Sequence, residues 1–203
     1  MPRVLWLGDY RVSPHQLSLE FGVDALRFTT SYWYSDVDLL AIERALGRPF
    51  FRKLVFHIAA FEANKLGSLA PDRFDLGPFA DLYTDAFERL WRTVFRRVWA
   101  QWRYEHDRPH YDGPRIDGTS RACPSPVAIG RPGPVEALVF RGGGKDSLVA
   151  MRLLEEAGIP YASYAYAHSI YGRAETQHRL IDGLLDACRP VWTGEIDDRC
   201  SGT

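Results

Sequence analysis

Val135-Glu-Ala-Leu-Val-Phe-Arg-Gly-Gly-Gly-Lys-Asp-Ser147 is the stretch that decides how the second half of the chain is interpreted. A short apolar run leads into three glycines (142–144), and Leu148, Met151 and Leu154 then recur at helical spacing. Glycine permits a sharp turn and a close approach to a ligand, and a helix start presents free N–H groups and the positive end of its dipole. The pattern predicts a strand, an anion-binding loop and a helix.

The three residues after the glycines indicate which anion this loop would bind. Lys145 supplies a positive charge for phosphate oxygens, and Ser147 supplies a hydroxyl donor in the first helical turn. Asp146 is an anion in an anion site, which is explained if it meets Mg²⁺ bridging the phosphates, directly or through water. A carboxylate at a helix N-terminus can also be only a cap, so both roles stay open.

Spacing rejects one other phosphate motif, the Walker A loop, and fits a second, the dinucleotide fingerprint, poorly. A Walker A loop would need glycine at position 139 and serine or threonine at 146, where the chain has Val139 and Asp146. A dinucleotide fingerprint would need glycine or alanine at Ser147 and an acidic residue about twenty positions further on, where residues 161–167 are tyrosine, alanine and serine.

The segment from Gly142 to Ser147 resembles the Ser-Gly-Gly-x-Asp-Ser loop of the pyrophosphatase-loop (PP-loop) ATP enzymes, members of the adenine-nucleotide α-hydrolase-like (HUP) superfamily. Five of the six places fit, and Gly142 stands where the family most often has serine. The resemblance implies a parallel Rossmann-like sheet, ATP and Mg²⁺ as cofactors, and AMP and pyrophosphate as products.

The same resemblance assigns roles to individual residues. Lys145 and Asp146 would be catalytic, with Asp146 as the metal ligand, and the end of the second strand would meet the adenine. The residues expected around ATP are Gly142, Gly143, Gly144, Lys145, Asp146, Ser147, Ala167 and His168. His168 could also serve as a base, although a histidine at a strand end is more often structural.

Enzymes with this loop adenylate a carboxylate, an amide or urea oxygen, or a tRNA base. Three scattered cysteines (Cys123, Cys188 and Cys200) and a formal net charge of -1 argue against sulfur transfer and RNA binding, so a carboxylate acceptor is favoured. A more distant resemblance, in element order and in Phe140 to Leu148, is to the ATP-dependent UDP-N-acetylmuramoyl-L-alanyl-L-glutamate epimerases of peptidoglycan synthesis. A tRNA- or nucleobase-modifying enzyme and a non-catalytic nucleotide-binding or interaction module remain alternatives.

Composition and periodicity divide the chain into three regions. Residues 1–110 begin with strand-like alternation up to about position 38, predicting an antiparallel hairpin or meander, and then change to helical spacing up to about 104, including one long helix between Leu82 and Trp102. Residues 111–134 are a proline- and glycine-rich linker. Residues 135–203 read as strand, loop, helix, strand, helix and strand, which predicts a parallel sheet.

The N-terminal region contains two further sets of polar residues. Arginines on the long helix (Arg89, Arg92, Arg96, Arg97 and Arg103) could face nucleic acid, but we interpret them as the solvated back of an aromatic core face. His57, Glu62, Asn64 and Lys65 lie on or near one helix and could contact substrate, although solvated or capping roles are favoured.

Neither a membrane span nor a signal-peptide core is present in the sequence, so a cytoplasmic protein without a membrane partner is expected. Residues 194–203 read as polar coil. Only three strands fit after residue 134, whereas sheets of this superfamily commonly have five. We therefore expect the acceptor side of the site to be missing from this chain. Either the chain is part of a longer protein, or it is a shortened product, or a partner supplies the remainder, and the third strand would then be an exposed edge.

Overall fold

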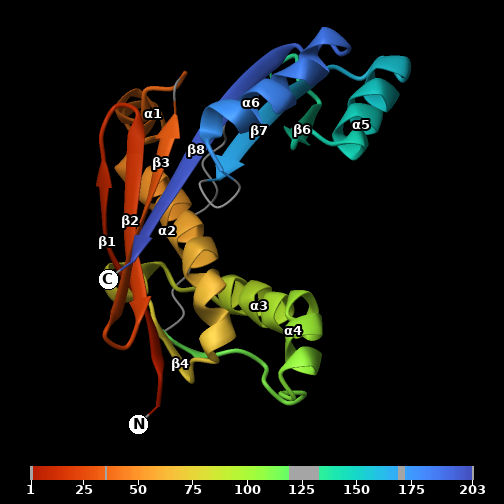
Figure 1. The fold of residues 1–203 in the computed structure, drawn as a ribbon. Coiled ribbons are helices and arrows are strands. Elements are labelled where there is room, and N and C mark those ends of the chain that lie inside the picture. The colour runs from red at the N-terminus through yellow and green to blue at the C-terminus, as the bar shows by residue number, and fades with distance from the viewer. Residues whose placement is uncertain (1, 35, 119–132, 169–171, 203) are drawn as a thin grey trace.

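The structure, a computed structural model, describes residues 2–34, 36–118, 133–168 and 172–202 (Figure 1). It is a mixed α/β protein with one eight-stranded sheet in the order β5-β4-β1-β2-β3-β8-β7-β6. A large apolar core lies in the N-terminal part, and a small one is centred on Met151, Tyr161 and Cys188 in the C-terminal part. The predicted α/β class is confirmed at this level.

The antiparallel strands predicted within residues 1–38 are present as β1 (Val4–Val12), β2 (Gln16–Val23) and β3 (Leu26–Tyr34). In β2, Leu17 and Leu19 are buried, as the alternating sequence requires for a sheet with one covered face. Two short strands that the sequence analysis missed, β4 (Arg73–Asp75) and β5 (Arg115–Asp117), extend this sheet parallel to β1.

Helices cover the buried face of the N-terminal strands. The long helix α2 packs against β1 and β2, with α1 just before it in the chain. These elements, with two 3₁₀ turns, are α1 (Leu39–Leu46), α2 (Arg48–Asn64), η1 (Lys65–Leu69) and η2 (Gly77–Leu82).

The prediction of one continuous helix between Leu82 and Trp102 is wrong. It consists of α3 (Asp85–Thr93), a π-helical turn η3 (Val94–Val98) and α4 (Ala100–Glu105). Large aromatic residues recur here every four positions, at 87, 91, 95 and 99, whereas an α-helix turns every 3.6 residues. Such a row drifts round the helix, and the wider π turn offsets the drift.

The interpretation of the arginines is confirmed for most of them. Phe87, Trp91 and Phe95 are buried in the core, while the arginine side chains at 89, 92, 96 and 97 are exposed. Arg103 differs, since it is largely buried and donates a 2.6 Å hydrogen bond to the carbonyl oxygen of Arg96.

The C-terminal part has the predicted order of strand, loop, helix, strand, helix and strand. β6 pairs in parallel with β7, and β7 pairs in parallel with β8. The elements are β6 (Ala137–Arg141), α5 (Lys145–Glu156), β7 (Tyr161–His168), α6 (Ala174–Asp182), the 3₁₀ turn η5 (Gly183–Asp186) and β8 (Trp192–Gly202).

The last strand corrects two predictions. Residues 194–202 were expected to be coil, but they form most of β8, which crosses from the C-terminal to the N-terminal part in Figure 1. Residues 192–198 pair with β7, and residues 196–202 pair antiparallel with β3. The edge strand of this half of the sheet is therefore β6 and not β8, because β3 supplies β8 with a second neighbour.

The predicted linker is also more ordered at its start than expected, because β5 lies within it. Residues 119–132 fall outside the described part of the chain. No helix among the described residues is long and apolar enough to cross a membrane.

Candidate functional site

The glycine loop joins the carboxyl end of β6 to the first turn of α5. Gly143 has φ +77°, in the left-handed region that side chains rarely adopt, so this position favours glycine. Gly144 precedes the helix in an extended conformation, and no side chain caps the helix start. The N–H groups of the first turn of α5 therefore have no side-chain cap, which is the geometry that an anion would need.

The Ser147 side chain is hydrogen-bonded to the backbone at the start of the loop. Its hydroxyl accepts a 3.1 Å hydrogen bond from the Gly142 N–H and donates a 3.3 Å bond to the Phe140 carbonyl oxygen. The side chain therefore lies at the loop, as expected, but its hydroxyl proton is directed to the backbone. A rotation of the hydroxyl hydrogen would be needed for it to donate to a phosphate.

Lys145 and Asp146 are both exposed in the first turn of α5. Neither side chain forms an ion pair or hydrogen bond with another described residue. Within the described residues there is no cluster of three or more metal-ligating side chains. The exposed carboxylate of Asp146 has the oxygen ligands that Mg²⁺ would need beside phosphate oxygens and water.

Arg141 is a residue of this site that the sequence analysis missed. It is the last residue of β6, its side chain is fully buried, and its Nη1 lies 3.5 Å from Oδ1 of Asp182 at the end of α6. A Cβ atom added to Gly143 would lie 3.4 Å from Cγ1 of Ile181, so the same end of α6 packs against the loop. A charged residue closing an apolar strand, just before the glycines, was the available signal.

The second strand brings its end to the same edge of the sheet as the loop. Arg141 pairs with Ala165, so Ala167 and His168 extend beyond the level at which β6 ends. Ala167 is buried, and the side chain of His168 lies outside the described part of the structure. The backbone at Ala167 and His168 thus lies at the carboxyl end of β7, next to the strand that carries the loop, while residues 169–171 are not described.

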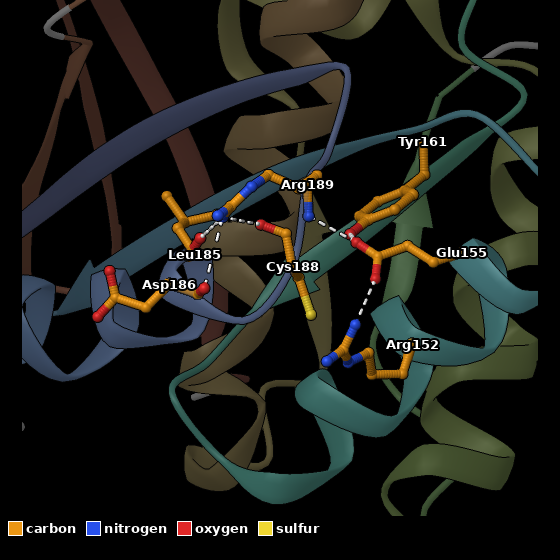
Figure 2. Close-up of polar contacts among 7 residues, drawn as sticks. All are labelled: Arg152, Glu155, Tyr161, Leu185, Asp186, Cys188 and Arg189. Carbon is orange, nitrogen blue, oxygen red and sulfur yellow. Dashed lines mark hydrogen bonds and ion pairs between the residues drawn. The ribbon is translucent and has the colours of Figure 1, made fainter.

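A hydrogen-bonded cluster at the other end of α5 fixes this helix to the sheet (Figure 2). The carboxylate of Glu155 accepts bonds from the Tyr161 hydroxyl at 2.9 Å and from the Arg189 backbone N–H at 2.5 Å. Arg152 adds a third bond at 3.2 Å. These donors, the Arg189 N–H above all, hold the pKa of Glu155 below its usual range.

Cys188 lies beside this cluster in the small core (Figure 2). Burial raises the pKa of its thiol, with the Glu155 carboxylate acting in the same direction. A buried thiol that resists ionisation is a packing residue and not a nucleophile.

The four polar residues of the N-terminal region are not brought to the loop. Glu62 is buried and paired with Lys65 at 2.9 Å, and Asn64 accepts a 3.0 Å hydrogen bond from the Trp99 indole. His57 packs against the rings of Phe56 and Phe87, which stack on each other, and burial, followed by the charge of Lys53, lowers its pKa. These contacts are structural, but only Lys65 is exposed to solvent, so the favoured interpretation of solvated or capping residues does not describe Glu62, Asn64 and His57.

Comparisons with protein-family models, with curated proteins and with solved structures found no match for this chain.

Proposed function

We propose that this chain binds Mg-ATP at the loop from Gly142 to Ser147 and belongs to an enzyme that adenylates an acceptor and releases pyrophosphate. The observation that carries the proposal is the loop itself. A parallel strand runs through a left-handed Gly143 into an uncapped helix start, and Lys145 and Asp146 stand exposed at that start.

The parallel order β8-β7-β6, with the loop at the carboxyl end of β6, supports half of a Rossmann-like sheet of the HUP type. In the proposed complex, the Lys145 ammonium and the first-turn N–H groups neutralise phosphate charge. Asp146 holds Mg²⁺ against the phosphate oxygens. ATP supplies AMP as the activating group on the acceptor.

A carboxylate is the proposed acceptor, with an activity like that of the UDP-N-acetylmuramoyl-L-alanyl-L-glutamate epimerases as the specific case. Adenylation of the glutamate carboxylate would make the neighbouring Cα proton acidic enough for removal and return on the other face. A further stretch of chain or a partner would supply the acceptor side. A tRNA or nucleobase acceptor is a weaker alternative, since the formal net charge of -1 gives the chain no overall attraction for RNA.

Lysine labelling tests the nucleotide site directly. The chain has only three lysines, Lys53, Lys65 and Lys145. An acyl phosphate ester of ATP transfers its acyl group to a lysine next to the terminal phosphate, so we expect labelling at Lys145 that excess Mg-ATP prevents. Lys53 and Lys65 serve as internal controls. Equal labelling of all three, unaffected by ATP, would contradict the proposal.

A calorimetric titration with Mg-ATP, run beside Lys145→Ala and Asp146→Ala, then measures affinity. A product assay with carboxylate acceptors separates the catalytic from the non-catalytic reading, because AMP and pyrophosphate mark cleavage between the α and β phosphates. Saturable binding of ATP without formation of AMP would favour a nucleotide-binding module. The absence of the family's serine at Gly142 is compatible with such a module. No binding to the folded chain at millimolar ATP would remove the ATP site altogether.

A further inference from the structure

An apolar cavity of about 260 Å³ lies between helix α2 and the C-terminal strands. Its floor is a stripe on α2 made of Phe51, Leu54, Val55 and Ile58. These positions follow the i, i+3, i+4, i+7 spacing of one helix face, so the stripe presents a continuous hydrocarbon surface. Phe51 and Val55 are fully buried, whereas Leu54 is 41% exposed. The floor is therefore covered at Phe51 and Val55 and exposed to solvent at Leu54.

The opposite wall comes from two of the three parallel strands, β7 and β8. Tyr164 of β7 and Trp192 of β8 lie on the face of these strands that does not carry α5, and their rings are 5.6 Å apart. The third side is formed by α1 and the segment before it, including Leu39 and Ile42. Trp192 is 43% exposed and forms the mouth with Leu54. The cavity is thus enclosed by elements of both halves of the chain.

The chemistry of the lining selects an uncharged ligand. Lysine, arginine and histidine side chains do not line the cavity among the described residues. Burial raises the pKa of Tyr164 to about 12, and the neighbouring charge of Asp36 acts in the same direction. Burial also raises the pKa of Tyr34, a second tyrosine of the lining. A ligand carboxylate would meet the same desolvation as both tyrosines, and the same Asp36 charge as Tyr164.

We propose that this cavity is a binding site for a small uncharged molecule with an aromatic or branched aliphatic body. An apolar cavity of about 150 Å³ is large enough to bind benzene, so the present one holds a ring with a short chain. The head of such a ligand reaches water past Leu54 and Trp192. The site is separate from the glycine loop, because it lies on the other face of the strands from α5, and it does not depend on the proposed ATP activity.

The test uses two probes with the same body, 3-phenylpropan-1-ol and 3-phenylpropanoate, each titrated into the full chain without nucleotide. Binding is followed by calorimetry and by tryptophan fluorescence. We expect the alcohol to bind with a Kd on the order of 10⁻⁴ to 10⁻³ M, the range that ligand efficiency allows for about ten non-hydrogen atoms. The carboxylate should bind at least tenfold more weakly. Trp192→Phe should remove most of the fluorescence change, because Trp192 lines the mouth.

Two variants locate the site. Ile58→Phe places a ring in the cavity and should weaken the alcohol at least tenfold. Leu54→Arg, at the exposed rim, should fold normally and bring the carboxylate to within a few-fold of the alcohol. Val98→Arg, an equally drastic change at a position 73% exposed on η3, is the matched control and should alter neither probe. Failure of the folded chain to bind the alcohol, equal binding of both probes, or binding that ignores both variants would overturn the proposal.

Discussion

The Glu155 cluster gives the sharpest test of how the C-terminal part is held together. Glu155→Ala removes the acceptor of the Tyr161 hydroxyl, on a tyrosine that is only 2% exposed, and of the Arg189 N–H. A hydrogen bond to a charged group contributes about 1.5–3 kcal/mol, and an unsatisfied buried donor costs about 1–3 kcal/mol. Because water can reach the exposed Arg189 backbone, and the exposed Arg152 pair adds little, we expect a loss of about 2–3 kcal/mol in the free energy of unfolding.

The pH dependence follows from the direction of the pKa shift. The folded-state pKa of Glu155 lies below its unfolded value, so its carboxylate stabilises the fold above the unfolded pKa of about 4.3, and this contribution is lost as the pH falls through the folded pKa. Glu155→Gln keeps the shape and one acceptor but removes the charge. The stability difference between wild type and Glu155→Gln should therefore be constant near neutral pH and shrink in acid.

Urea unfolding followed by circular dichroism at pH 7 and at acid pH measures these differences. Hydrogen exchange of the β7 amides assigns the loss to the C-terminal part. Glu156, the neighbouring exposed glutamate on α5, supplies the matched control, and Glu156→Ala should change stability by less than about 0.5 kcal/mol. A Glu155→Ala loss no larger than that of the control, or a Glu155→Gln difference that does not shrink in acid, would refute this reasoning.

Three further predictions concern the loop and the small core. Gly143→Ala should lower the free energy of unfolding by about 1–2 kcal/mol, because alanine disfavours φ +77°. Gly144→Ala, whose new Cβ has open space around it, should lower it by less. Urea titrations compare the two variants, and equal losses would count against the left-handed turn. Gly142→Ser restores the hydroxyl of the family loop, and there is room for it, because a new Cβ meets only the Ser147 hydroxyl, at 4.0 Å. Calorimetry should therefore show tighter Mg-ATP binding by this variant. Weaker binding would argue against this loop as the site. Cys188 should react with iodoacetamide at neutral pH far more slowly in the native chain than in urea, by peptide mass mapping, since burial raises its pKa; similar rates would mean that the small core is open.

The parts of the fold that the sequence predicted are those in which one local pattern decides the outcome. Alternation in Leu17 to Phe21 requires one covered face, and β2 has it. The strand, glycine loop and helix from Val135 to Glu156 follow from glycines placed between two different apolar periods. The candidate loop was predictable for the same reason, because all its residues lie within one short stretch.

What could not be predicted depends on contacts between distant segments. β4 and β5 are three-residue strands, too short to show a period. β4 forms on the edge of β1, and β5 forms on the edge of β4. The π turn η3 results from packing a four-residue aromatic row against the core, which local propensity does not encode. The role of Arg141 also required the position of Asp182, some forty residues later in the chain.

β8 is the clearest case, and it changes how the division of the chain is understood. Its sequence from Gly194 is polar and contains glycine and aspartate, which disfavour strands, so local propensity predicts coil. The backbone groups of a strand are nevertheless satisfied wherever two neighbours are available, and β7 and β3 both offer an edge here. Residues 196–202 pair with β3 of the N-terminal half, and residues 192–198 pair with β7 of the half that carries the glycine loop. One strand is therefore shared by the two halves of the sheet. The proline-rich boundary in the sequence is therefore not a boundary in the hydrogen bonding, and the position of the loop depends on the whole sheet.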